Sequence, residues 1–152
     1  MSEDSLVGRR LNGYELESIL GSGLYTNVYR ATRSGDERVF AVKIFPRDLA
    51  QDRFFAPRFK REAGDLARLN HPALVPVLAA GQAEGRPFLV MPFYEGGSLA
   101  QRLAGEAPLP LEEVVRIVER IAGALDAVHE RGGLHRDVKP SNILLDAEGR
   151  AA

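Results

Sequence analysis

Five short stretches in the first half of the chain are predicted to be β-strands, and the first of them, residues 14–21, alternates polar and apolar residues as a half-buried strand does. Glycines, a Ser-Gly-Asp turn signal and a proline separate these stretches. They are residues 14–21, 27–32, 38–45, 74–80 and 87–91. The tight connections between the first three stretches favour an antiparallel meander.

A helix is expected between the third and the fourth strand, over residues 56–69. Phe59, Glu62, Leu66 and Leu69 are spaced three, four and three residues apart, so they form one helical stripe. The Asn-His-Pro sequence that follows ends the helix.

The second half of the chain is predicted to be mainly helical. A glycine pair, Gly96-Gly97, indicates a hinge, and a short helix over residues 99–104 and a long one over residues 111–131 follow it. The long helix begins after Pro110 and ends before Gly132. Its apolar positions recur every three or four residues and are Val114, Val118, Ile121, Leu125 and Val128.

The composition is that of an ordinary globular protein, with 152 residues, 45% of them hydrophobic and 27% charged. The formal net charge of −1 gives no strong attraction to polyanions, so we expect no nucleic-acid partner. The absence of cysteine excludes disulfides and zinc–thiolate sites and fits a cytoplasmic location. We expect no membrane segment in this chain, because no apolar run approaches the length of a membrane span. We also expect no secretory signal, because the first residues, Met1 to Asp4, carry acids and no apolar run.

Gly21 and Gly23 join two predicted strands. Glycines in such a loop let backbone N–H groups approach phosphate oxygens without a side chain in the way. The alternative is an ordinary hairpin turn. A dinucleotide-binding fold is disfavoured, because this loop leads into a strand rather than a helix.

Lys43 lies within an apolar strand, whose alternation places Ala41, Lys43 and Phe45 on one face. Glu62 lies in the apolar stripe of the predicted helix, where a carboxylate is costly unless it is paired. We therefore predict a buried ion pair between Glu62 and Lys43. The alternatives are a lysine that reaches solvent at the sheet edge and a partly exposed glutamate at the margin of the stripe.

Residues 135–142 contain an imidazole, a guanidinium, a carboxylate, an ammonium and an amide, and an apolar run follows directly. A polar cluster anchored by a short buried strand is well suited to hold side chains rigidly at a site. The alternative is a charged surface loop.

Taken in order, these motifs resemble the eukaryotic-type serine/threonine protein kinase domain, in the form common in bacteria. The resemblance extends from about Tyr14 to the last residue. It implies an α+β kinase-like fold, in which a five-stranded antiparallel sheet and helix αC form the N-lobe and the first, mainly helical part of the C-lobe follows. Residues 1–13 would be an N-terminal extension, residues 14–95 the N-lobe and hinge, and residues 96–152 a partial C-lobe.

The resemblance also implies ATP and Mg²⁺ as cofactors and a protein Ser/Thr hydroxyl as the substrate. Asp137 and Lys139 would be catalytic, and Asn142 would bind metal. The ATP-binding residues would be Leu20, Gly21, Gly23, Val28, Ala41, Lys43, Glu62, Met91, Pro92, Tyr94 and Leu144. Among these, Met91 would be the gatekeeper, while the Pro92 carbonyl and the Tyr94 N–H would face the adenine.

The chain departs from the family pattern at three places. Thr26 stands at the third glycine position of the loop, and Gly133 replaces an apolar residue before the catalytic loop, which we expect to loosen the packing there. The sequence contains no Asp-Phe-Gly motif, whose aspartate would supply the second magnesium ligand. We therefore expect a truncated domain whose uncovered long helix promotes self-association.

Three hypotheses for the function follow. The first is a piece of an ATP-dependent serine/threonine kinase that is active only in a longer form. The second is a truncated, pseudokinase-like module that binds a nucleotide or a protein without phosphotransfer. The third is a gene fragment without function. The presence of Lys43, Asp137 and Asn142 favours the first hypothesis, because a decayed pseudokinase often loses one of them.

Overall fold

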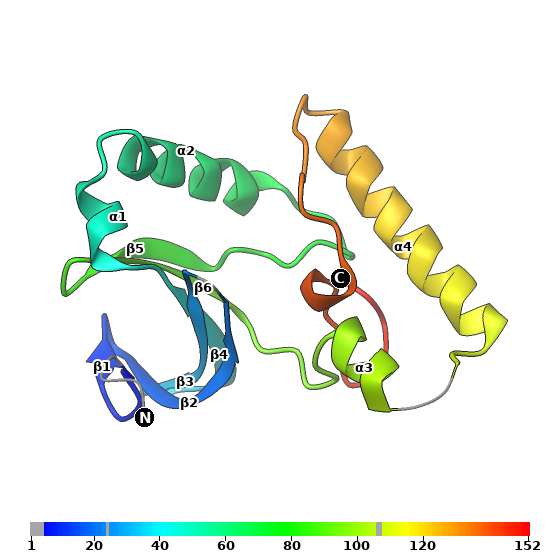
Figure 1. Ribbon diagram of the computed structural model, residues 1–152, viewed down its shortest axis with the longest axis horizontal. Coiled ribbons are helices and arrows are strands. Elements are labelled where there is room, and N and C mark those ends of the chain that lie inside the picture. Colours follow the sequence, from blue (N-terminus) through cyan, green and yellow to red (C-terminus); the bar gives the residue numbers. More distant parts are fainter. Residues whose placement is uncertain (1–4, 24, 106–107) are drawn as a thin grey trace. The chain divides into compact units, whose positions relative to one another are not determined.

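The structure is a computed structural model that describes residues 5–23, 25–105 and 108–152 (Figure 1). Its described residues form two compact units. Unit 1 combines the chain up to Arg68 with Pro76–Phe93, and unit 2 combines Leu69–Val75 with the chain from Tyr94 to Ala152. The loop Leu69–Val75 therefore belongs to unit 2, although the residues on both sides of it belong to unit 1.

The described residues of unit 1 contain a six-stranded antiparallel sheet in the order β1-β2-β3-β4-β6-β5. The strands are β1 (Arg10–Leu11), β2 (Tyr14–Ser22), β3 (Asn27–Arg33), β4 (Asp36–Ile44), β5 (Ala79–Ala83) and β6 (Arg86–Pro92). All five expected strands are present, and the two-residue strand β1 adds a sixth. The fourth expected strand begins later than predicted and continues to Ala83, because the turn lies at Glu84-Gly85, where both residues have positive φ.

The core of unit 1 covers one face of this sheet. Every second residue of β4 belongs to this core, namely Phe40, Val42 and Ile44, which are 1–4% exposed. Leu6 and Leu11 from the segment before β2 join the same cluster, so these residues are part of the unit's core.

Helix α2 (Phe55–Arg68) follows the short helix α1 (Arg47–Gln51), which the sequence pattern did not predict. The Asp52 carboxylate accepts hydrogen bonds from the Phe54 and Phe55 N–H groups at 2.8 and 2.7 Å and so stabilises the start of α2. The helix packs on β5 (Figure 1) and joins the end of β4 through a cluster of three aromatic rings. The ring centroids of Phe45, Phe55 and Phe59 lie 5.3–5.7 Å apart.

This aromatic cluster sets the rotation of α2. The buried stripe contains Phe55, Phe59 and Ala63, which is 5% exposed. The predicted stripe shares Phe59 with the observed one but placed Glu62 where Ala63 is buried, which is an error of one position or about 100° around a helix. Glu62 lies at the margin of the buried face instead.

Unit 2 contains α3 (Leu99–Gly105), α4 (Leu111–His129) and the 3₁₀ turn η1 (Pro140–Asn142). Its core is formed by Leu99, Ile117, Leu145 and Ala151. The buried positions of α4 are Ile117, Ala124 and Val128, whereas Val118, one of the predicted apolar positions, is 59% exposed. No helix in the described part of the chain is long and apolar enough to cross a membrane.

The segment after η1 is hydrogen-bonded on both of its sides. On one side, the Leu99 N–H donates to the Ile143 carbonyl and the Leu145 N–H to the Gly97 carbonyl, both at 2.8 Å. On the other side, Leu144 and Ala152 exchange two backbone hydrogen bonds of 2.8 Å. Residues 144–152 therefore form a short hairpin, referred to below as the C-terminal hairpin.

Gly96 lies against the backbone of this hairpin, and we expect Gly96→Ala to destabilise unit 2. A Cβ at Gly96 would lie 2.6 Å from the Asp146 carbonyl oxygen and 2.7 Å from that of Leu145. Relieving such a clash costs about 1–3 kcal/mol. Urea unfolding monitored in unit 2 measures this loss. The matched control is Gly105→Ala, where a Cβ would meet no atom within 4 Å. Equal stability of the two variants would contradict the close approach.

Candidate functional site

The strand register of unit 1 gathers four of the predicted site residues on one face of the sheet. Lys43 lies opposite Val28 on β3 and Leu89 on β6, and Ala41 lies opposite Met91 on β6. Directly paired residues point to the same face of a sheet. Val28, Ala41, Lys43 and Met91 therefore share the face that is turned away from the core.

The Lys43 side chain is partly buried, and its ammonium lies 5.6 Å from the centre of the Phe45 ring. This cation–π contact keeps Lys43 and Phe45 on the common face that the alternation of the strand predicts. Because β4 lies between β3 and β6, the lysine is on a central strand and not at the edge of the sheet.

Glu62 does not occupy the buried position that was predicted for it. Its Oε1 forms an ion pair with Arg58 Nε at 2.7 Å, and its side chain is 50% exposed. The reason is the rotation of α2, which buries Ala63 and turns Glu62 to the margin. A pair of this kind, one helical turn apart and exposed, contributes only about 0.3–0.5 kcal/mol. The prediction of a buried glutamate is therefore wrong.

The loop between β2 and β3 is a tight hairpin. The Gly23 N–H donates a 2.7 Å hydrogen bond to the Thr26 carbonyl, and Gly21 lies opposite Val28. A Cβ at Gly21 would meet no atom within 4 Å, so the backbone there is open to an approaching group. Leu20 lies at a register shift of β2 and is 37% exposed. Leu24, which is part of the sequence motif, lies outside the described residues.

The predicted hinge residues divide between the two units. Strand β6 ends at Pro92, which lies opposite Phe40, and the longer segment of unit 2 begins at Tyr94. Burial raises the pKa of the Tyr94 phenol, and the nearby Asp146 carboxylate raises it further. The Tyr94 side chain therefore belongs to the environment of the C-terminal hairpin.

In unit 2, the structure brings three predicted residues into direct contact. The Asn142 side-chain N–H group donates to the Asp137 Oδ2 at 2.9 Å and to the Asp137 carbonyl at 2.8 Å. The Lys139 ammonium lies 3.1 Å from the same Oδ2. The hydrogen bond from Lys139, followed by that from Asn142, lowers the pKa of the Asp137 carboxyl. The carboxylate is therefore anionic at neutral pH, and its side chain is 61% exposed.

The backbone around this carboxylate is strained. Arg136 has a φ of 67°, in the left-handed region that residues other than glycine rarely adopt. The Asp137 N–H donates to His135 Nδ1 at 3.3 Å, and the Asn142 N–H donates to the Lys139 carbonyl at 2.9 Å. Backbone strain of this kind is concentrated at functional sites, where the surrounding structure supports it.

The residues that flank this loop hold it at both ends. Leu144 follows Asn142 closely and is paired on both sides, with Ser98 and with Ala152. Before the loop, the Gly133 N–H donates to the Val128 carbonyl at 3.0 Å, and a Cβ at Gly133 would lie only 3.0 Å from a Val128 methyl group. The expected loosening at Gly133 is therefore wrong, because the glycine allows a close approach to α4.

Arg120 is a residue of unit 2 that none of the sequence motifs indicated. Its Nε donates to the Ala151 carbonyl and its Nη2 to the Pro72 carbonyl, both at 2.9 Å. The signal was available, since Arg120 lies three residues after Ile117 and four before Ala124, within the buried stripe of α4. An arginine at such a position needs acceptors for its donors.

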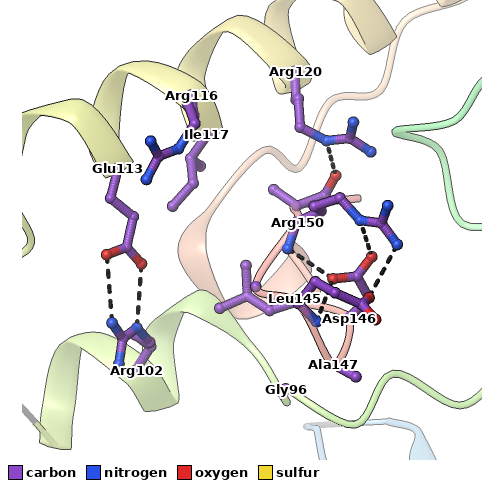
Figure 2. A pocket seen from close by; sticks show the side chains of 13 residues that line it. Gly96, Arg102, Glu113, Arg116, Ile117, Arg120, Leu145, Asp146, Ala147 and Arg150 are labelled. Carbon is purple, nitrogen blue, oxygen red and sulfur yellow. Dashed lines mark hydrogen bonds and ion pairs between the residues drawn. The ribbon is translucent and has the colours of Figure 1, made fainter.

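Arg120 also lines a cavity of about 500 Å³ within unit 2, between α3, α4 and the C-terminal hairpin (Figure 2). Its acidic side chains are paired with arginines: Glu113 with Arg102 at 3.3 Å, and Asp146 with Arg150 at 2.7 Å. Among the described residues no group of three or more His, Asp or Glu side chains could hold a metal ion.

A curled antiparallel sheet with a lysine on the face opposite its core, followed by a helical unit with an Asp-Lys-Asn cluster, is the organisation of a protein kinase domain. Residues 14–151 match the family model "Protein kinase domain", and the chain belongs to this family.

The chain is 40% identical over 144 residues to the serine/threonine-protein kinase PknH of Mycobacterium tuberculosis, covering 95% of this chain and 23% of PknH. It is 36% identical over 145 residues to the serine/threonine-protein kinase PrkC of Bacillus subtilis, of which it covers 22%. The crystal structure of the Mycobacterium tuberculosis PknI kinase domain is similar, with a TM-score of 0.80 and 36% identity over 95% of this chain and 59% of that chain. The chain thus spans less than a quarter of these two curated relatives.

The contact between Lys139 and Asp137 predicts how the carboxyl titrates. In Lys139→Met we expect the pKa of Asp137 to rise toward its ordinary value of 3.8, because the first cause of its depression is removed. Since the folded pKa lies below the unfolded one, the contact stabilises the fold above pH 3.8 and loses this effect as the pH falls through the folded pKa. A carboxyl ¹³C NMR titration measures the change. Lys60→Met, at an exposed position of α2, is the control, and an unchanged Asp137 pKa in Lys139→Met would contradict the contact.

Proposed function

We propose that this chain supplies the nucleotide-binding and catalytic-loop part of a protein serine/threonine kinase. In its complete form the enzyme transfers the γ-phosphate of ATP to a Ser or Thr hydroxyl of a protein. One observation carries the proposal: the Asp137 carboxylate is held by both Lys139 and Asn142 on a strained loop. A charged surface loop would have no need of this arrangement.

Unit 1 is suited to one part of the nucleotide site. Lys43 would bind the α- and β-phosphates, and the hairpin of Gly21 and Gly23, whose backbone is open at Gly21, would cover them. The remaining roles in the nucleotide site follow the family: Leu20, Val28 and Ala41 above the adenine, Met91 as gatekeeper, the Pro92 carbonyl and Tyr94 N–H toward the adenine edge, and Leu144 below it. The common sheet face of Val28, Ala41, Lys43 and Met91 supports these assignments.

Glu62 would position Lys43 in the active form of the domain. In the present structure it pairs with Arg58 at the margin of the buried stripe. A rotation of α2 by one residue, about 100°, would bring Glu62 into the stripe. The aromatic cluster of Phe45, Phe55 and Phe59 opposes this rotation.

The chemistry at the second unit is proton transfer and charge neutralisation. The lowered pKa keeps Asp137 anionic, so it can orient the attacking hydroxyl and accept its proton. Lys139, which lies 3.1 Å from Asp137, would neutralise charge on the phosphoryl group in transfer. ATP supplies the phosphoryl group, and the transfer breaks its bond to the β-phosphate oxygen while a bond to the substrate oxygen forms.

Asn142 fits the role of a magnesium ligand. Its amide nitrogen donates to Asp137, which leaves the amide oxygen available to a hard cation. This neutral oxygen would be one ligand, and phosphate oxygens with Mg²⁺-bound water would be others.

For the domain organisation, we propose residues 14–95 as the N-lobe with hinge and residues 96–152 as part of the C-lobe, with residues 1–13 preceding them. The lack of cysteine favours a cytoplasmic location.

The alternative function is a pseudokinase-like module that binds a nucleotide or a protein without phosphotransfer. Glu62, paired away from the stripe, is the observation that favours this alternative.

In the protein as its gene encodes it, we expect Asp137→Asn to lower phosphotransfer to a protein acceptor by about 10²–10⁴-fold, since it removes the general base. Binding of ATP, measured by calorimetry, should remain, and Lys43→Met should weaken it. The control is Asp126→Asn, which changes an exposed aspartate of α4. Nucleotide binding without turnover in the unmodified protein would favour the binding module, and full activity of Asp137→Asn would exclude the proposed base.

We further propose that the 152-residue chain by itself associates through the exposed apolar face of α4. Leu111, Val115 and Val118 are 77%, 45% and 59% exposed and lie on one helical stripe. Replacing Val115 and Val118 by serine should raise the monomer fraction in sedimentation experiments, because less apolar surface is then exposed. Val7→Ser in unit 1, at a position 44% exposed, is the control. A monodisperse unmodified monomer would refute this association.

A further inference from the structure

Arg120 lies in the buried stripe of α4. The neighbours in this stripe are Ile117, Ala124 and Val128, which are 6%, 2% and 8% exposed. A guanidinium carries five N–H donors, and such a group inside an apolar face is costly unless its donors are satisfied. The contacts of Arg120 therefore explain why an arginine is tolerated there.

The two acceptors of Arg120 come from segments that are far apart in the sequence. Nε donates to the carbonyl of Ala151, 31 residues later, and Nη2 donates to the carbonyl of Pro72, 48 residues earlier. Figure 2 shows the side chain reaching from α4 toward the hairpin. The rigid planar fork of a guanidinium fixes the distance between its two acceptors.

The Pro72 carbonyl belongs to the loop Leu69–Val75, which directly follows α2. This loop has internal hydrogen bonds, from the Ala73 N–H to His71 Nδ1 at 3.1 Å and from the Leu74 N–H to the His71 carbonyl at 3.0 Å. His71 Nε2 lies 3.8 Å from the Cβ position of Gly123 on α4, and Ala73 is 2% exposed. The loop is therefore an ordered turn seated on α4.

The Ala151 carbonyl belongs to the C-terminal hairpin. Ala151 is fully buried and bridges Leu145, which follows Asn142 by three residues. The same strand pair holds the end of the Asp137–Asn142 loop. Arg120 thus connects the segment that follows α2 with the segment that follows the proposed catalytic loop.

We propose that Arg120 is a positioning residue that couples the loop Leu69–Val75 to the C-terminal hairpin. The guanidinium transmits a loosening of one segment to the other, because both depend on the same side chain. The residue touches no reacting group and acts through the backbone of the hairpin. The coupling goes beyond the proposed function, and only its effect on turnover rests on that function.

Hydrogen exchange of single amides tests the coupling in the protein as its gene encodes it. In Arg120→Ala we expect the amides of Leu144, Ala152 and Leu74 to exchange about 5- to 30-fold faster, since two hydrogen bonds to the guanidinium are lost. The matched control is Arg116→Ala, one turn earlier on α4. Arg116 lines the same cavity and makes no ion pair or hydrogen bond within the described residues, so its removal should leave these amides unchanged.

Two further variants separate coupling from a general loss of structure. Arg120→Lys keeps the charge but has a single donor group, so it should restore protection in one segment and not in both. Arg150→Ala removes the 2.7 Å ion pair to Asp146 in the hairpin turn. With Arg120 present, Arg150→Ala should also make the Leu74 amide exchange faster. In the Arg120→Ala background, adding Arg150→Ala should not change the exchange rate of Leu74 any further.

The proposal is overturned if Arg120→Ala leaves either segment unchanged, if Arg120→Lys protects both fully, or if Arg150→Ala reaches Leu74 without Arg120. Where Arg120→Ala does not fold, the segment-specific protection in Arg120→Lys decides.

In the kinase assay, loss of the coupling should lower kcat about 5- to 30-fold while KM for ATP is unchanged. Faster exchange in a protein whose unmodified form has no turnover would refute the proposed function and leave the coupling intact.

Discussion

The two-residue period of β4 is the constraint on which unit 1 depends. Phe40, Val42 and Ile44 enter the core, so Ala41 and Lys43 must point to the opposite face. A slip of one residue would expose three large apolar side chains and bury the ammonium. The core therefore determines where the lysine lies, and the pairing with β3 and β6 places Val28 and Met91 beside it.

Unit 2 solves a different problem, because its chemistry-bearing residues lie on a loop. A loop is rigid only when its ends are held and its side chains bond to one another. Here Gly133 fits closely against Val128 before the loop, and the doubly paired residues 143–145 follow it. Within the loop, the amide of Asn142 donates to both the backbone and the side chain of Asp137. The strain at Arg136 is sustained by these anchors.

The sequence predicted much of this arrangement, since alternation, β-rich or apolar stretches and turn residues indicated the strands of the sheet, and the Asp-Lys-Asn spacing indicated the polar cluster. It did not predict β1 or α1, which are too short for a periodic pattern to be recognised. It also placed the turn after β5 too early, because Ala79–Ala83 contains mostly small residues and no strong alternation. The bond from Arg120 to Pro72 joins positions 48 residues apart, a relation that no local pattern contains.

A charge within an apolar helical stripe needs a partner. This rule wrongly predicted a buried partner for Glu62, whereas for Arg120 it would have correctly predicted buried acceptors. The difference lies in the phase of each helix. In α2 the ring of Phe45 selects Phe55 and Phe59, so the stripe continues to Ala63 and excludes Glu62. In α4 the buried residues Ile117 and Ala124 lie one turn before and one turn after Arg120, so Arg120 is within the buried stripe itself. An error of one position moves a side chain by about 100°, which is enough to exchange a buried ion pair for an exposed one. A charged residue therefore indicates a functional contact only when tertiary packing, rather than spacing alone, has established the phase of its helix.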